Sequence, residues 1–109
     1  MISTVLRYEI EIKYNNFEWK LRRTITPNYE VEDHFTVKRF LFWTREKHFN
    51  VIRNERATRI KARKRALKLA RKFFQSYSEV RVFVIFKFPE IDEPIRHRTW
   101  ENNRFYSTH

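Results

Sequence analysis

The segment from Thr58 to Tyr77, TRIKARKRALKLARKFFQSY, constrains this chain most, because its spacing is that of a long two-sided helix. At about 100° per residue, the apolar residues gather on one side. They are Ala62, Ala66, Leu67, Leu69, Ala70, Phe73, Phe74 and Tyr77. The other side is cationic and holds Lys61, Lys64, Arg65, Lys68, Arg71 and Lys72. Such a helix, predicted over 59–76, must dock its apolar side on the protein and expose the cationic side.

Two-residue alternation predicts a β-hairpin at the start of the chain. Leu6–Tyr14 alternates apolar and charged residues, and Phe17–Ile25 returns after Asn15 and Asn16. Asparagine tolerates positive φ better than other non-glycine residues, so this pair is a credible turn. The residues of the return strand expected to point inward are Phe17, Trp19 and Leu21.

A second β region follows the helix. Glu79–Phe88 is apolar on both sides over its middle, which is typical of a central strand. Ile95–Trp100 and Arg104–Tyr106 are expected to form a last hairpin over another Asn-Asn pair, Asn102 and Asn103.

The pattern is weaker between the first hairpin and the helix. The acidic segment Tyr29–His34 is expected to be a loop, and the aromatic-rich segment Phe35–Trp43 a third strand. Thr44–Lys47 is expected to turn the chain, and His48–Arg53 to pair back as a fourth strand.

Neighbouring strands joined by short turns favour an antiparallel sheet. No linker, repeat or low-complexity tract divides the sequence, so residues 1–109 are predicted to be a single domain. We therefore expect an α+β fold: a single antiparallel β-sheet of about five to six strands with one amphipathic helix packed across one face, in the order ββ(ββ)αββ. An exposed sheet edge would allow a homodimer.

Composition excludes several function classes. The chain has no Gly, where average usage of about 7% predicts roughly eight, so phosphate-cradling and dinucleotide-binding loops are close to excluded. It has no Cys, hence no disulfide, thiol nucleophile or Cys-ligated metal, which suits a reducing cytoplasm. There is no run of 18 apolar residues and no signal-peptide pattern, so we expect a cytoplasmic protein that does not enter a membrane.

The formal net charge of +11 is concentrated in one part of the chain. Residues 59–88 hold ten Lys and Arg against one Glu, whereas 1–58 have a net charge of +3 and 89–109 of −1. Arg81 and Lys87 in the strand after the helix could extend the cationic patch. Basic residues also crowd the first turns of the helix, where its dipole disfavours them by about 0.3–1 kcal/mol each. Either the charges serve binding, or a nearby acid such as Glu55 or the 30–33 segment offsets them.

Catalytic and cofactor patterns are weak. The four His residues lack metal-ligand spacing, so neither a metal nor another cofactor is expected. Arg96-His97-Arg98 could act on a phosphodiester with His97 as acid–base, but a lone His beside arginines is more often a binding or surface residue. The aromatic residues Trp19, Phe40, Phe42 and Trp43 could stack single-stranded bases, but they are more often core in a small sheet.

The leading interpretation is a non-enzymatic nucleic-acid-binding protein that contacts phosphates through the cationic side of helix 59–76. The rival is a protein-interaction module or inhibitor docking on an acidic host-protein surface; a solvated face and a small nuclease rank lower. A small, glycine-free, basic domain also resembles phage or mobile-element accessory proteins. The pattern of Thr58, Lys61, Lys64 and Ala66 resembles the helix of arm-type DNA-binding domains of phage integrases. The usual glutamate is missing and further strands follow, so no residue role is transferred.

Overall fold

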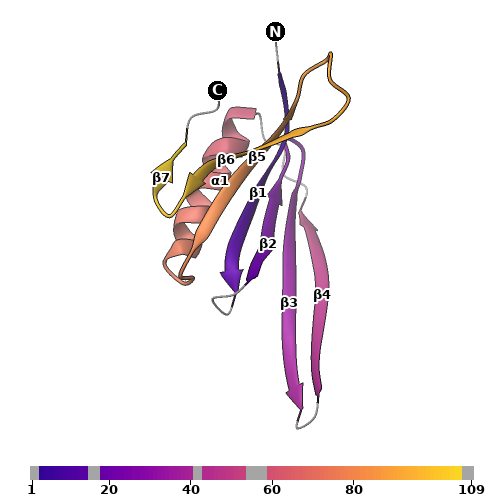
Figure 1. Ribbon diagram of the computed structural model, residues 1–109, viewed down its shortest axis with the longest axis vertical. Helices are drawn as coiled ribbons and strands as arrows, with labels where there is room; N and C mark the ends of the chain where they lie inside the picture. The colour runs from indigo at the N-terminus through magenta and orange to yellow at the C-terminus, as the bar shows by residue number, and fades with distance from the viewer. Residues whose placement is uncertain (1–2, 15–17, 41–42, 54–58, 107–109) are drawn as a thin grey trace.

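The computed structural model describes residues 3–14, 18–40, 43–53 and 59–106. Its strands are β1 (Thr4–Tyr14), β2 (Glu18–Ile25), β3 (Glu30–Phe40), β4 (Trp43–Arg53), β5 (Val80–Lys87), β6 (Ile95–Glu101) and β7 (Arg104–Phe105). One helix, α1 (Arg59–Phe74), separates β4 from β5. The described strands form one antiparallel sheet in the order β4-β3-β2-β1-β5-β6-β7, with α1 across one face (Figure 1). The expected α+β fold is confirmed, with seven described strands rather than five or six.

The core lies between α1 and the centre of the sheet. β1 and β5 pair along most of their length, and α1 packs mainly on these two strands and on β2. Alternate residues of the strands meet the small residues of the helix, which allow the two layers to approach closely. The buried cluster comprises Tyr8, Ile10, Ile12, Ile25, Ala62, Ala66, Leu69, Ala70, Val80, Val82, Val84 and Trp100. The expected apolar side of the helix and the central position of β5 are therefore confirmed.

The last hairpin turns without glycine, as the sequence predicts. Asn102 and Asn103 have φ of 47° and 67°, in the left-handed region that asparagine tolerates. Asn102 also accepts a hydrogen bond on Oδ1 from the Val80 amide at 2.9 Å, and its own amide donates to the Val80 carbonyl at 3.0 Å. The turn is therefore held to the first residue of β5 by two hydrogen bonds. The first Asn-Asn turn, at residues 15–16, lies outside the described residues.

Two expectations for the middle of the chain are wrong. Residues 30–34 are not a loop but the start of β3, and residues 44–47 are not a turn but part of β4. The acids at 30–34 are compatible with a strand because arginines neutralise them: Arg23 lies 3.4 Å from both Glu30 and Glu32. Residues 44–47 pair in register with 36–39 as part of the β3–β4 ladder.

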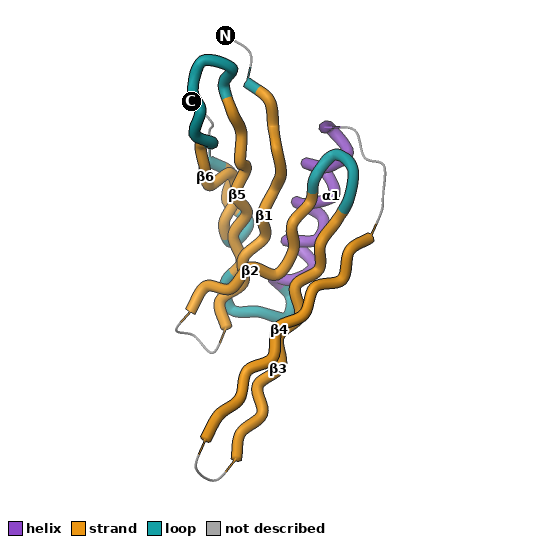
Figure 2. Tube along the Cα trace, turned by 90° about the vertical axis from the view of Figure 1, so that its right-hand side faces the viewer, coloured by secondary structure: helices purple, strands orange, loops and turns teal. Residues whose placement is uncertain are grey.

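The ribbon formed by β3 and β4 projects from the rest of the sheet (Figures 1 and 2). β2 pairs with β3 only from Arg23↔Glu32 to Ile25↔Glu30, whereas β3 and β4 pair from Glu30↔Arg53 to Phe40↔Trp43. The two strands therefore continue well beyond the end of their pairing with β2. This extension gives the molecule a length of 56 Å against widths of 28 and 25 Å.

A β-bulge in β2 overturns the predicted facing of its first half. The register with β1 shifts between Ile10↔Arg23 and Glu11↔Leu21, so an extra residue, Arg22, interrupts the alternation. Leu21 and Trp19 consequently lie on the sheet face opposite α1, rather than inward as expected. The predicted inward position of Phe17 lies outside the described residues.

Candidate functional site

The cationic side of α1 faces away from the sheet. Of the residues predicted to form it, five are exposed: Lys61, Lys64, Lys68, Arg71 and Lys72. The helix holds them there because Ala66 and Ala70, on the opposite side, are fully buried against the sheet. Arg63, which was not among the predicted cations, is also exposed. We call Lys61, Lys64, Lys68, Arg71 and Lys72 together the outer cationic surface of α1.

The sixth predicted residue, Arg65, has a different environment. It is half-buried on the flank of α1, and its Nε donates to Oε1 of Glu30 on β3 at 2.8 Å. The structure therefore brings one of the acids of residues 30–33 to the helix, which was the alternative to binding that the sequence left open. The other suggested acid, Glu55, lies outside the described residues. Among the six predicted cations, Arg65 is thus the one for which the described residues include an acidic partner, Glu30.

Three lysines of the outer surface are unpaired within the described part of the chain. No acidic side chain described by the structure forms an ion pair with Lys64, Lys68 or Lys72. No acid is present in the first turn of α1, and Arg71 and Lys72 lie in its last turn. The dipole of the helix therefore favours the two cations at its C-terminal end and disfavours those near its start.

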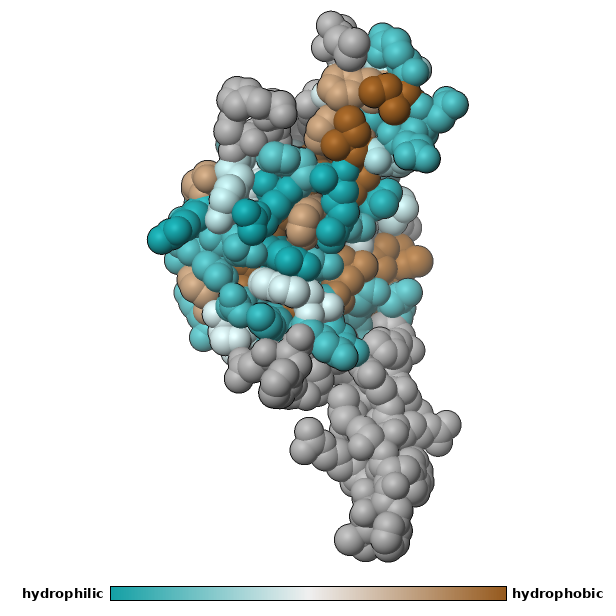
Figure 3. Space-filling view, in the orientation of Figure 1, coloured by the Kyte–Doolittle hydropathy of each residue, from teal (hydrophilic) through white to brown (hydrophobic). Residues whose placement is uncertain are grey.

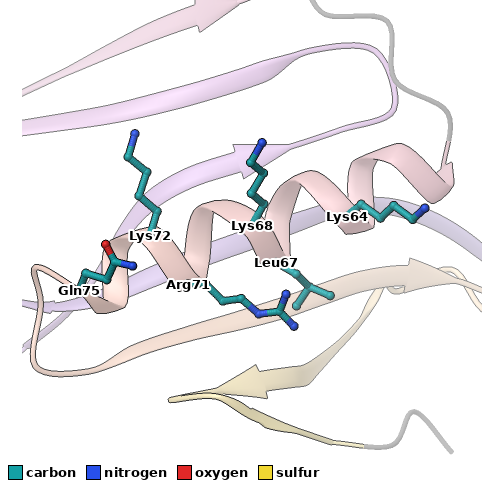
Figure 4. A pocket seen from close by; sticks show the side chains of 6 residues that line it. All are labelled: Lys64, Leu67, Lys68, Arg71, Lys72 and Gln75. Carbon is teal, nitrogen blue, oxygen red and sulfur yellow. The ribbon is translucent and has the colours of Figure 1, made fainter.

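A shallow groove of about 470 Å³ runs along this surface, open to solvent (Figure 4). Lys68 and Lys72 extend to one side of the helix, and Leu67 and Arg71 to the other. The Arg71 guanidinium lies 5.8 Å from the centre of the Phe105 ring on β7, so this side of the groove reaches the last hairpin. Gln75 completes the lining with Lys64. Leu67 and Gln75 were not expected here, since their positions near the cations become evident only once the helix is docked.

The cations on the opposite sheet face have a different environment. Arg81 lies 2.6 Å from Glu11 and its guanidinium stacks 3.9 Å from the centre of the Trp19 ring. Arg96 contacts Glu11 at 3.1 Å and lies 3.4 Å from the centre of the Phe83 ring. Figure 3 shows that hydrophilic residues predominate over the middle of this face. Here the positive charges are neutralised by glutamates and stacked on aromatic rings, which holds them in place.

Arg81 and Lys87 therefore do not extend the helix patch. Both occupy β5 positions on the face away from α1, because Glu11↔Arg81 and Thr4↔Lys87 alternate with the buried pairs of the β1–β5 ladder. The outer cationic surface of α1 and the glutamate-paired arginines Arg81 and Arg96 therefore lie on opposite sides of the sheet.

The residues of the possible phosphodiester site are not brought together. His97 pairs with Val84 on the side that α1 covers, whereas Arg96 and Arg98 project from the other side. The Nε2 atom of His97 is buried and has no hydrogen-bond partner among the described residues. Arg98 instead pairs with Glu101 at 3.0 Å. The three residues are separated because successive side chains of a strand point to opposite faces of the sheet.

The described part of the chain contains no cluster of three or more acidic or histidine side chains arranged to hold a metal ion. Nor does it contain a helix with the length and apolar character needed to cross a membrane. Comparison with known proteins gives no further guide, because no protein family, curated protein or solved structure matches the chain.

Proposed function

We propose that this protein is a non-enzymatic nucleic-acid-binding domain that contacts backbone phosphates through the outer cationic surface of α1. One observation carries the proposal: Lys64, Lys68 and Lys72 share an exposed helix surface and have no acidic partner in the described structure. Elsewhere the chain places a glutamate beside arginines such as Arg81 and Arg96. A surface that needed only to be soluble would more often mix both signs.

The dimensions of the surface fit a phosphate backbone. At 1.5 Å per residue, Lys61 and Lys72 are about 16 Å apart along the helix axis, which is enough to meet about three successive phosphates of one strand. Leu67 and Arg71 widen the contact toward β7, where Phe105 is exposed. Contacts of this kind supply affinity and orientation but do not read base sequence. The absence of cysteine fits action in a reducing, cytoplasmic setting.

Salt dependence is the direct test of phosphate contacts. A labelled oligonucleotide of about 20 nucleotides, as single strand and as duplex, is titrated by fluorescence anisotropy at several salt concentrations near 100 mM. Each phosphate contact should contribute about −0.7 to −0.9 to the slope of log K against log salt. With about three contacts, a slope between about −2 and −3 is expected.

A matched pair of charge reversals locates the contact. Lys68→Glu lies in the centre of the outer cationic surface, whereas Lys87→Glu changes the net charge equally on the opposite sheet face. We expect Lys68→Glu to weaken binding roughly tenfold and Lys87→Glu to change it by less than about twofold. Absence of measurable binding by the wild type near 100 mM salt would refute the proposal and favour an acidic protein partner instead.

A further inference from the structure

The side of α1 that faces β7 combines a cation with an exposed aromatic ring. Phe105 is 56% exposed, although its partner in the β6–β7 ladder, Trp100, is fully buried. Directly paired residues of antiparallel strands share a sheet face, and Trp100 contacts Phe74 of α1 edge-on at 6.2 Å between ring centres. Phe105 therefore lies on the face that α1 covers, but one strand farther out, where its ring remains in solvent.

The ring of Phe105 has a more distant cationic neighbour than the rings on the opposite sheet face. Trp19 and Phe83 carry arginine guanidiniums at 3.9 and 3.4 Å from their ring centres. The Arg71 guanidinium lies 5.8 Å from the centre of the Phe105 ring, close to the outer limit of about 6 Å for a cation–π contact. Arg71 thus lies beside an aromatic surface that a ligand can reach.

Phe105 was not among the four residues that the sequence suggests for base stacking. One of these, Trp19, already stacks on an arginine. The other three, whose side chains lie outside those that the structure describes, are Phe40, Phe42 and Trp43. The position of Phe105 beside the helix becomes evident only from the fold, because β7 and α1 are far apart in the sequence.

The groove on α1 connects this ring with the outer cationic surface. Leu67 and Arg71 extend to the same side of the helix, one turn apart (Figure 4). Leu67 packs against the core, so it contributes an apolar contact surface next to Arg71. The six residues that line the groove include four cations and no acid. The groove is therefore suited to an anionic ligand that also has a flat apolar part.

We propose that this groove binds a single-stranded nucleic acid, with one unpaired base stacked on Phe105 and the adjoining phosphates held by Arg71 and Lys68. The inference rests on the proposed function, because it takes the same site and adds a preference among nucleic acids. An arginine beside the ring suits this role, since its planar guanidinium pairs with phosphate oxygens through two parallel hydrogen bonds. Every base has a flat π-surface, so the stack holds an unpaired base whatever its identity.

The ring distinguishes a single strand from a duplex. Lysines contact the phosphates of either form. The bases of a duplex are paired and stacked on one another, so they do not reach Phe105, whereas those of a single strand are free to do so. The protein should therefore bind a single strand more tightly than a duplex of equal length.

The test measures binding by fluorescence anisotropy to a labelled oligodeoxythymidine of about 20 nucleotides, to a duplex of equal length and to an abasic strand of equal length. Phe105→Ala should weaken binding of the oligodeoxythymidine at least about fivefold and leave duplex binding within about twofold. The abasic strand keeps the phosphates but has no bases, so it should bind Phe105→Ala and the wild type equally.

Three further variants separate stacking from a structural effect. Phe105→Leu keeps an apolar side chain without a ring, so it should weaken single-strand binding as Phe105→Ala does. Phe105→Trp keeps a ring and should preserve binding, with more quenching of tryptophan emission by oligodeoxythymidine than in the wild type. Tyr29→Ala removes another exposed ring, outside the groove lining, and should leave binding unchanged. Circular dichroism verifies folding, and Phe105→Leu keeps the test decisive if Phe105→Ala does not fold.

The outcomes separate this inference from the proposed function. Loss of binding to every ligand in Lys68→Glu, with wild-type binding in Phe105→Ala, would overturn the base stack and leave the proposed function standing. Equal weakening of single-strand, duplex and abasic binding in Phe105→Ala would also overturn the stack, since stacking acts only on unpaired bases. If the wild type binds none of the three ligands at about 100 mM salt, the proposed function fails and this inference with it.

Discussion

Arg65 on α1 and Glu30 on β3 form an ion pair of 2.8 Å across 35 residues of sequence. The Glu30 side chain is only 4% exposed, while that of Arg65 is 34% exposed. Glu30 also lies 3.4 Å from Arg23 on β2, so one buried carboxylate connects the helix with two strands. The pair anchors the base of the projecting ribbon and removes Arg65 from the cations available to a ligand.

Glu30→Gln should destabilise the protein. The change removes the negative charge between two guanidinium groups and leaves the buried Arg23 with Glu32 as its remaining described acid. We expect the free energy of unfolding to fall by about 1.5–3 kcal/mol, the range for a hydrogen bond to a charged group. Urea denaturation at neutral pH, followed by circular dichroism, measures the change.

The control for this prediction is Glu90→Gln, which makes the same chemical change at an exposed residue of the β5–β6 connection. A surface change of this kind is expected to alter stability by no more than about 0.5 kcal/mol. Equal unfolding midpoints for the two variants would show that Glu30 does not hold the ribbon to the helix.

The elements predicted well from sequence are those with a local, periodic cause. The apolar positions of α1 recur at helical spacing, with Ala66 and Ala70 both fully buried as expected. The alternation of β5 and the Asn102-Asn103 turn are likewise properties of consecutive residues. Local patterns sufficed for these elements because the side chains that decide the structure are only a few residues apart.

The errors arose where distant residues decide the structure. Glu30 is compatible with a strand because Arg23, on the neighbouring strand, and Arg65, 35 residues away on α1, neutralise it. The bulge at Arg22 reverses the facing of Trp19, and no composition signal marks it. The sequence also could not distinguish Arg65 from the exposed cations of α1, because its position on the helix does not show that Glu30 of β3 lies beside it.

Asn103 offers a test of the glycine-free turn. Its φ of 67° is unfavourable for a residue with a Cβ and no compensating polar side chain. Asn103→Ala should therefore lower the free energy of unfolding by about 1 kcal/mol, whereas Asn103→Gly should be close to neutral. Thermal unfolding of the two variants measures the difference. Equal loss in both would mean that the asparagine side chain, not the backbone conformation, stabilises the turn.

Ala66 tests the close approach of α1 to the sheet. It is fully buried within the cluster that includes Ile10 and Val82, so a larger side chain has no space. We expect Ala66→Leu to cost about 1–3 kcal/mol of stability through overpacking. The matched variant Lys64→Leu, on the exposed side of the same helix, should cost far less. Equal tolerance of leucine at both positions in urea denaturation would contradict the docking of α1 described here.

Neutral substitutions at Lys68 and Arg81 test whether ligand binding depends on an exposed cation or equally on a cation that is already paired with a glutamate. Lys68 is exposed in the groove on α1, while Arg81 is held by Glu11 and Trp19 on the other sheet face. Lys68→Gln should reduce the magnitude of the log K against log salt slope by about 0.7–0.9, the contribution of one phosphate contact. Arg81→Gln should leave the slope unchanged although it lowers stability, because its guanidinium loses both stacking and an ion pair. If both substitutions reduce the slope equally, total charge rather than the α1 surface determines binding, and the proposed interface is wrong.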